Sequence, residues 1–401
     1  MRHSLFRVPL LLLALTVSIA SCVKDDSSLD DLLQRYADDA DQNVKNISFY
    51  YGTSDDDEDD ITLPASDSVE HFDVLHTIDI VYDGNKASVS TLPSGVQSIC
   101  NGARVEITST LPHVRYIVSG SSSDGQLSIQ SVEKFRLDLN GVTLCSTDGP
   151  AIYSQCSKKM FVVLANGTLN TLTDGAVYTP LAEKKMKGAL YTRGNLIISG
   201  GGALTVTGQT HNAIATDDYL RVRSGCQLFV NAEGGHGLKA NEGIYINGSV
   251  VNISVTASGG KGLNSESDIV IDGGHTTVIA EATSLIVEPS DTTHCAGVKS
   301  DNHITVNGGI LNILCLGDNA KGMKSDGNMT LNGGEVNIVT KGLTLLSKPK
   351  ALKCENNLYI NGGELYAYAL HAKPVDADGQ MTVQSRYNKM VNTPHLFYIR
   401  Y

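Results

Sequence analysis

Charged side chains recur at fixed places in the second half of this 401-residue chain. Within a motif that returns about every 25 residues, one position is lysine in four copies, namely Lys239, Lys299, Lys324 and Lys353. The position two residues further on is a carboxylate in five copies, namely Asp217, Glu266, Asp301, Asp326 and Glu355. A row of ammonium groups suits the carboxylates of an acidic polymer, whereas a row of carboxylates could bind sugar hydroxyls or Ca²⁺. Alternatively, the two rows neutralise each other, with about 0–1 kcal/mol from each exposed pair.

Two tyrosines could add to such a surface. Tyr245 and Tyr359 share one position of the motif, which is predicted to point outward, and their rings could stack on sugar rings. The chain has no tryptophan, which weakens a mechanism that depends on aromatic platforms. Asp301 and Asp326 are candidate Ca²⁺ ligands, because carboxylate oxygens suit this ion. These residues predict a polysaccharide-binding strip, with Ca²⁺ as a candidate cofactor.

The element that must position these side chains is the repeat itself. Its anchoring apolar residue advances by 24, 24, 25, 35, 25 and 29 residues, at Leu190, Ile214, Leu238, Leu263, Val298, Met323 and Leu352. Each copy alternates apolar and polar residues in three short runs with Gly-rich corners, which is typical of strands and turns. One such unit cannot bury its own apolar face, so the copies must stack. The pattern predicts an all-β fold, a parallel β-helix with one three-strand coil per repeat.

The coil is expected over residues 73–370, because strand-like segments with Gly, Asn and Asp turns begin near Asp73. Residues 371–401 lose the repeat and are predicted to cap the open sheet edge at that end. One corner should carry a structural ladder of side chains, formed by Asn247, Asp272, Asn307, Asn332 and Asn361. The step of 35 implies an insertion around 285–294, and another loop spans 177–187. Either insertion could border a binding site.

The beginning of the chain predicts export. Residues 1–21 combine two arginines with an apolar run, which is typical of a secretory signal peptide. The residues around Cys22 resemble a bacterial lipobox, and Val23-Lys24-Asp25-Asp26 resembles the surface-export signal of Bacteroidetes lipoproteins. We expect an outer-membrane lipoprotein, held by lipid at Cys22 and facing the cell surface. Residues 22–72 are predicted to be an acidic, flexible tether.

Composition excludes some classes of function. Much of the net charge of −12 lies in the predicted tether, and no basic region suggests nucleic-acid binding. Seven of the eight cysteines lie outside the lipobox at irregular spacing. We expect them to be small core residues rather than a disulfide framework.

A longer series of motifs resembles one bacterial family. LDLNGVTL, DGPAIY, LANGTLNTLTDG and the later NGG corners are similar to exported carbohydrate-binding proteins with a right-handed parallel β-helix, a fold similar to pectate-type polysaccharide lyases. The resemblance runs from about residue 75 to 365 and implies binding of cellulosic or acidic polysaccharides, with Ca²⁺ on the coils. Where the family often has Asp before the Gly of the motif, this chain has Lys261 and Lys321, which cannot bind Ca²⁺. Asp318 is the nearest remaining candidate ligand.

Two other functions fit the same scaffold. A β-elimination lyase needs a base above a uronate, and Lys299 or Lys324 could serve. A surface adhesin would need no glycan ligand. The sequence contains no nucleophile elbow, paired metal-binding histidines or phosphate loop. The predicted function is therefore non-catalytic binding of polysaccharide, and no catalytic residue is assigned.

Overall fold

The computed structural model describes residues 44–53, 64–178, 186–288, 291–384 and 389–400. The predicted signal peptide, Cys22 and residues 179–185 of the loop at 177–187 lie outside the described residues. The chain divides into two units, Met1–Val44 and Lys45–Tyr401, and the fold is that of the second. Among the described residues, helix is limited to two short 3-10 turns, η2 (Ala65–Asp67) and η3 (Val69–His71). No helix there is long and apolar enough to cross a membrane.

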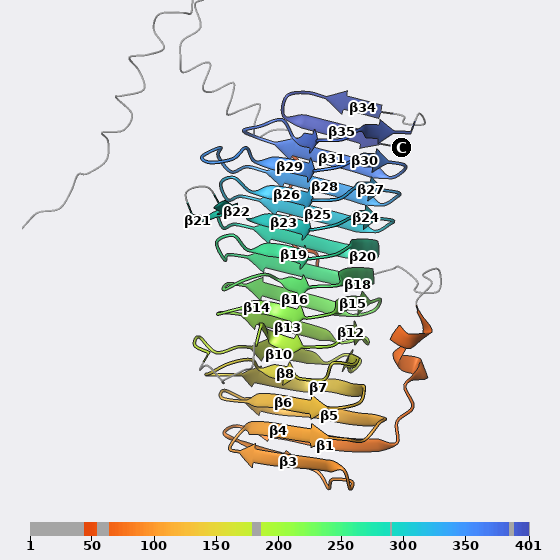
Figure 1. Cartoon of the computed structure of the whole chain (residues 1–401), viewed down its shortest axis with the longest axis vertical. Coiled ribbons are helices and arrows are strands. Elements are labelled where there is room, and N and C mark those ends of the chain that lie inside the picture. Colours follow the sequence, from red (N-terminus) through yellow and green to blue (C-terminus); the bar gives the residue numbers. More distant parts are fainter. Residues whose placement is uncertain (1–43, 54–63, 179–185, 289–290, 385–388, 401) are drawn as a thin grey trace, which may run out of the picture. The chain divides into compact units, whose positions relative to one another are not determined.

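One sheet carries the run of the repeat that contains the anchoring residue. From β4 onward its pairings are parallel, and each strand pairs with its equivalent one repeat later, so that Leu263 lies opposite Leu238 on one side and Val298 on the other. About eleven coils result (Figure 1). The predicted parallel β-helix is confirmed. The twelve strands of this sheet are β3 (Val96–Asn101), β4 (Arg104–Ser109), β6 (Gln126–Ser131), β8 (Ile152–Ser154), β11 (Gly188–Thr192), β14 (Asn212–Thr216), β17 (Leu238–Ala240), β19 (Lys261–Ser265), β23 (Ala296–Ser300), β26 (Lys321–Ser325), β29 (Lys350–Cys354) and β32 (Val375–Ala377).

The other two runs of each repeat form a second, 21-stranded sheet. In β18 and β20 both runs belong to one long strand that continues through the corner. An inserted hairpin, β21 (Leu285–Glu288) and β22 (Asp291–Thr293), stands apart from both sheets. The strands of the second sheet are β1 (His76–Asp83), β2 (Lys86–Val89), β5 (Val114–Ser122), β7 (Phe135–Cys145), β9 (Met160–Leu164), β10 (Leu169–Thr173), β12 (Leu196–Ser199), β13 (Ala203–Gly208), β15 (Tyr219–Arg223), β16 (Gln227–Ala232), β18 (Gly243–Val255), β20 (Ile269–Ala280), β24 (Ile304–Val306), β25 (Ile310–Cys315), β27 (Met329–Leu331), β28 (Glu335–Thr340), β30 (Leu358–Ile360), β31 (Glu364–Ala369), β33 (Met381–Val383), β34 (Lys389–Asn392) and β35 (Leu396–Arg400).

The interior of the coil is apolar, and its corners are held by stacked side chains. All seven anchoring residues are buried. The seven described cysteines are free thiols, and five of them are buried core residues as predicted: Cys156, Cys226, Cys295, Cys315 and Cys354. In the corner ladder, Asn361 Nδ2 donates to Asn332 at 2.9 Å and Asn332 Nδ2 donates to Asn307 at 2.8 Å. The glycine that follows is required: Gly334 has φ +76°, and a Cβ there would stand 2.6 Å from the carbonyl oxygen of Gly309.

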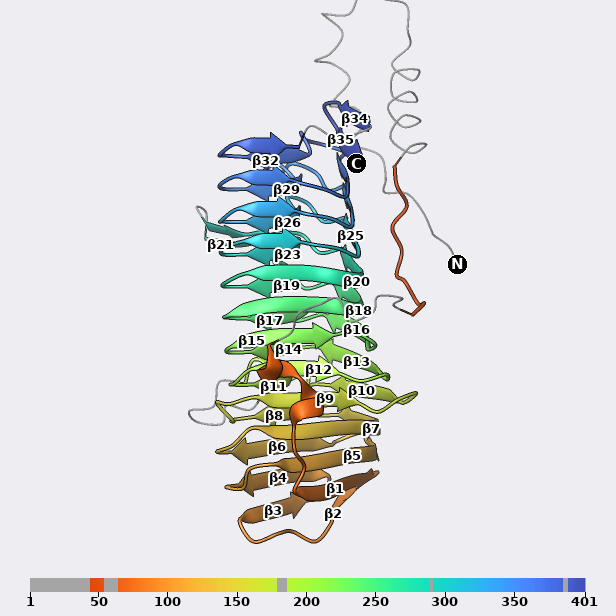
Figure 2. The same cartoon turned by 90° about the vertical axis from the view of Figure 1, so that its right-hand side faces the viewer.

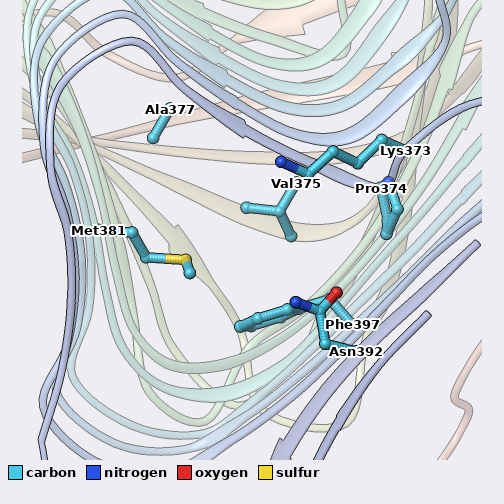
Figure 3. Close-up of a pocket in the computed structure, with 7 residues that line it drawn as sticks. All are labelled: Lys373, Pro374, Val375, Ala377, Met381, Asn392 and Phe397. Atoms are coloured by element: carbon cyan, nitrogen blue, oxygen red, sulfur yellow. The ribbon is translucent and has the colours of Figure 1, made fainter. Parts of the chain in front are cut away.

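The two ends of the coil are closed differently. Antiparallel hairpins, β1 with β2 and β3 with β4, form the first coil. At the other end, β32 and β33 still pair in parallel with β29 and β30, so the coil continues past the predicted boundary at residue 370. The antiparallel strands β34 and β35 then add to the edge at β31. A hollow of about 120 Å³ lies at this end, and Val375, Met381 and Phe397 point into it (Figure 3).

Two stretches of the predicted tether are fixed against the coil. The backbone N–H of Tyr50 donates to Asn252 Oδ1 at 3.1 Å, and its carbonyl accepts from Asn252 Nδ2 at 2.5 Å. Residues 64–72, called the strap below, cross β9, β12 and β15 (Figure 2). The tether prediction is corrected for residues 44–53 and 64–72, because specific side-chain contacts hold them. The rest of 22–72 lies outside the described residues.

Candidate functional site

The predicted row of lysines is largely paired with the neighbouring row of acids. Lys239 Nζ lies 2.7 Å from Glu266, Lys299 Nζ lies 2.6 Å from Asp326, and Lys324 Nζ lies 3.1 Å from Glu355. In each case the acid belongs to the next coil, and Lys353 likewise pairs with Asp378. The predicted alternative of mutual neutralisation therefore describes the contacts at Lys239 and Lys299.

Positive charge gathers instead around one cleft near the C-terminal end of the row. This cleft has a volume of about 520 Å³ and is called the basic cleft. Five lysines line it against two carboxylates, so ammonium groups outnumber acids. The lining residues are His294, Lys321, Lys324, Ser347, Lys348, Lys350, Lys353, Glu355 and Asp376.

Two adjacent strands and two insertions build the basic cleft. Strand β26 supplies Lys321 and Lys324, and β29 supplies Lys350 and Lys353 at the equivalent positions of the next coil. Ser347 and Lys348 come from the loop at 341–349, where the repeat lengthens to 29 residues. His294 directly follows the β21–β22 hairpin. The insertion predicted at 285–294 thus contributes to the cleft.

The loop that carries Ser347 is held by buried acceptors. The Oδ1 atom of Asn319 accepts three hydrogen bonds, from the backbone N–H groups of Leu345 at 2.9 Å, Leu346 at 2.8 Å and Ser347 at 3.1 Å. Asn319 itself is buried and has φ +60°. Asp318, a predicted metal ligand, accepts from the N–H of Leu343 at 2.7 Å. Both side chains therefore shape one wall of the cleft.

Burial controls the charge of two groups in the cleft. Lys321 Nζ donates to the carbonyl of Lys348 at 2.5 Å, to Ser347 Oγ at 3.2 Å and to the carbonyl of Asn319 at 3.3 Å. Burial, followed by the charges of Lys350 and Lys324, lowers the pKa of Lys321 to about 8. Burial also lowers the pKa of His294 to about 4, so this ring is neutral at pH 7. A bound anion would stabilise the charged form of Lys321.

Lys324 has the opposite electrostatic environment. Burial would lower its pKa, but hydrogen bonds and charge from Glu355 and Asp326 raise the pKa above its ordinary value. Lys324 therefore stays charged at neutral pH and suits anion binding rather than proton abstraction.

The predicted Ca²⁺ ligands contact lysines. Asp301 and Asp326 both pair with Lys299, and Asp318 lies in the wall described above. No group of three or more His, Cys, Asp or Glu side chains in the described part of the chain is arranged to hold a metal ion. At the position where the resembling family often has Asp, Lys261 Nζ donates to the carbonyl of Gly259 at 2.8 Å. Calcium binding stays a prediction.

The two predicted tyrosines lie on the other sheet. Tyr245 belongs to β18, where the Arg221 guanidinium carbon is 4.5 Å from its ring centroid, and Tyr359 belongs to β30. Neither lines the basic cleft, whereas Lys324 and Lys353 do. Sequence reasoning missed Lys321, Lys350, Lys348 and His294. Their signal was the lysine before the motif glycine and the step of 29, which were weighed only as a lost metal site and an irregular spacing.

The fold and the site together define a parallel β-helix with a lysine-lined cleft. Residues 101–377 match the family model described as carbohydrate-binding domain-containing protein, and the chain belongs to this family. A carbohydrate-binding domain-containing protein of Acetivibrio thermocellus is 31% identical over 150 residues, 36% of this chain and 50% of that protein. The chain thus matches half the length of that relative. A solved structure of a polysaccharide lyase-like protein from C. thermocellum has 19% identity and a TM-score of 0.47, covering 77% of this chain and 98% of that one.

Proposed function

We propose that this protein binds an acidic polysaccharide at the basic cleft without cleaving it. The observation that carries the proposal is the convergence of five lysines, from two adjacent strands and one loop, on a cavity of about 520 Å³. Membership of the carbohydrate-binding family supports a glycan as the ligand. The excess of ammonium groups favours a glycan with carboxylate groups.

The spacing of the lysines suits a polymer. Lys321 lies opposite Lys350, and Lys324 lies opposite Lys353, on strands about 4.8 Å apart. A chain of uronate sugars along the coil axis would therefore meet one pair of ammonium groups after another. Several weak contacts along one polymer add up to useful affinity. Lys324 and Lys353 would exchange part of their pairing with Glu355 and Asp378 for the ligand.

Two features of the cleft support binding rather than elimination chemistry. The pKa of Lys324 is raised, which makes it a poor base at neutral pH. Lys321 has the lowered pKa that a base needs, but its Nζ faces three acceptors, which suit an ammonium group. Such an environment positions a charge.

Binding is tested by titration calorimetry with galacturonate oligomers, and with neutral glucan oligomers of equal length as the reference. The Lys324→Ala/Lys353→Ala variant should bind the acidic oligomer about tenfold more weakly or worse, because each lost charged contact contributes about 1.5–3 kcal/mol. Lys158→Ala is the matched control, since Lys158 pairs with Glu133 away from the cleft. Equal binding of both oligomers, or no loss in the double variant, would refute the proposal. Unsaturated uronate appearing in the ultraviolet would establish a lyase instead.

The site of action is a separate proposal. Residues 1–22 support an exported lipoprotein of the outer membrane, attached by lipid at Cys22 and displayed on the cell surface. Labelled fatty acid should be incorporated into the wild-type protein and not into Cys22→Ala. Protease added to intact cells should then digest the β-helix. Incorporation of label in both proteins would contradict anchoring at Cys22.

A further inference from the structure

The strap places a carboxylate in a cationic pocket on the second sheet. Asp67 is fully buried, although it belongs to an irregular segment outside the coil. Its carboxylate accepts from Arg221 Nε at 2.8 Å and from the Tyr219 hydroxyl at 2.5 Å. Lys159 Nζ pairs with the same carboxylate. Three donors from β15 and the start of β9 thus converge on one side chain of the strap.

A second carboxylate and two aromatic rings extend this arrangement. Glu70 accepts from Arg223 at 2.9 Å. The Arg221 guanidinium lies over the Tyr245 ring, and Lys159 Nζ is 5.6 Å from the centroid of the Tyr219 ring. We call the surface under the strap the strap groove, which is formed by Lys159, Tyr219, Arg221, Arg223 and Tyr245. It combines cations for carboxylates with aromatic faces for apolar ring surfaces.

The strap is attached through side chains rather than by strand addition. Its backbone N–H groups at Asp67 and Phe72 donate to Pro64 and Val69 within the strap itself. Its apolar end, Val69 and Phe72, packs on Phe161 and Ile197. Lifting the strap would therefore leave the ladder of β9, β12 and β15 intact. It would also uncover three cations beside two tyrosines.

A purely structural clamp has no need of this chemistry. Burying an ion pair seldom stabilises a fold more than apolar residues of similar size, because both charges lose water. The contact of Val69 and Phe72 already supplies apolar adhesion. The charged part of the strap groove has the composition of a ligand site instead.

We propose that the strap groove is a second carboxylate-binding site for acidic glycan, and that Asp67 and Glu70 are internal ligands that the glycan displaces. The ligand class rests on the proposed function, whereas the site lies on a different sheet from the basic cleft. Two uronate carboxylates would take the places of the two strap carboxylates. The strap would then act as a competitor built into the chain.

The test uses the full chain with Asp67→Asn/Glu70→Gln, which keeps side-chain size and the apolar end of the strap. Calorimetry with galacturonate oligomers should show two sites per chain in this variant and one in the wild type. Adding Arg221→Ala to the variant should remove the second site and leave the first. A folded double variant that still has one site would overturn the proposal.

A second variant guards against loss of folding. Val69→Ala/Phe72→Ala loosens the strap without touching its charges, and it should also reveal the second site. If neither variant binds a second equivalent, the strap is a structural clamp only. The two proposals are separable, because Lys324→Ala/Lys353→Ala affects the first site alone. If the wild type binds no acidic oligomer but the strap variants do, the basic cleft is refuted and the strap groove stands.

Discussion

Lys321 couples the charge of the basic cleft to pH. Its pKa is lowered to about 8, mainly by burial, whereas a free lysine titrates at 10.5. The folded state thus disfavours the charged form, and this contribution makes the protein more stable as the pH rises from about 8 to 10.5. Affinity for acidic glycan should move the other way, since Lys321 loses its charge over the same range.

We therefore predict that galacturonate oligomers bind more weakly as the pH rises from about 7 to 9. Lys321→Met should weaken binding at the lower pH and flatten the dependence, because Lys324 and Lys353 stay charged. Calorimetry across this range in one buffer series measures both effects. A wild-type affinity that is constant up to pH 9 would show that Lys321 does not contribute.

The strap carboxylates give the opposite dependence in acid. Burial would raise the pKa of Glu70, but hydrogen bonds from Ser68 and Arg223 lower the pKa from 4.5 to about 2. Burial likewise opposes a low pKa at Asp67, yet hydrogen bonds from Lys159 and Tyr219 hold the pKa below its ordinary value. A carboxylate with a lowered folded pKa stabilises the fold above its unfolded pKa and loses that contribution as the pH falls.

Melting temperatures should therefore fall between about pH 4.5 and pH 2 more steeply for the wild type than for Asp67→Asn/Glu70→Gln. The side chain of Glu70 is 60% exposed, so most of the difference is expected from Asp67. Parallel curves for the two proteins would show that the strap carboxylates are already released at neutral pH.

At the scale of elements, the loop at 341–349 depends on one buried amide. Asn319→Ala removes the acceptor of three backbone N–H groups, a loss of about 1–3 kcal/mol. We predict a lower melting temperature and several-fold weaker binding of galacturonate, because Ser347 and Lys348 lose their fixed positions. Asn361→Ala is the matched control, since it removes one ladder hydrogen bond outside the cleft and should cost stability alone. Equal affinities in both variants would mean that the loop does not shape the site.

The repeat predicted the coil but could not predict the cleft. The alternation around Leu263 and Val298 specifies strands, and stacking of equivalent positions follows from the period, so the pairing registers agree with the alignment of the copies. The basic cleft forms where the period breaks, and a break in a repeat carries no rule for where its residues fold. His294 and Lys348 approach β26 through such breaks. The strap escaped prediction for a related reason: an acidic segment reads as solvated until the cations that meet Asp67 are brought together by the fold.

At the scale of the whole molecule, the question is how far along the coil a glycan extends. Strands β17 to β29 carry the lysine row from Lys239 to Lys353 across five coils, a span of about 19 Å at strand spacing. Only the C-terminal part of this row opens into the basic cleft. At Lys239 and Lys299 the acids of the next coil already occupy the ammonium groups.

Affinity should therefore rise with the length of a galacturonate oligomer only until the oligomer covers the basic cleft, and then level off. Lys299→Ala should leave the plateau unchanged, because a glycan would have to displace both Asp301 and Asp326 to reach this lysine. Calorimetry with a series of oligomer lengths, in the wild type and in this variant, measures the plateau. If affinity keeps rising with length and Lys299→Ala lowers it, the ligand runs along the whole charged row. The acids would then act as exchangeable counterions of a continuous strip, and the cleft would be only its most open section.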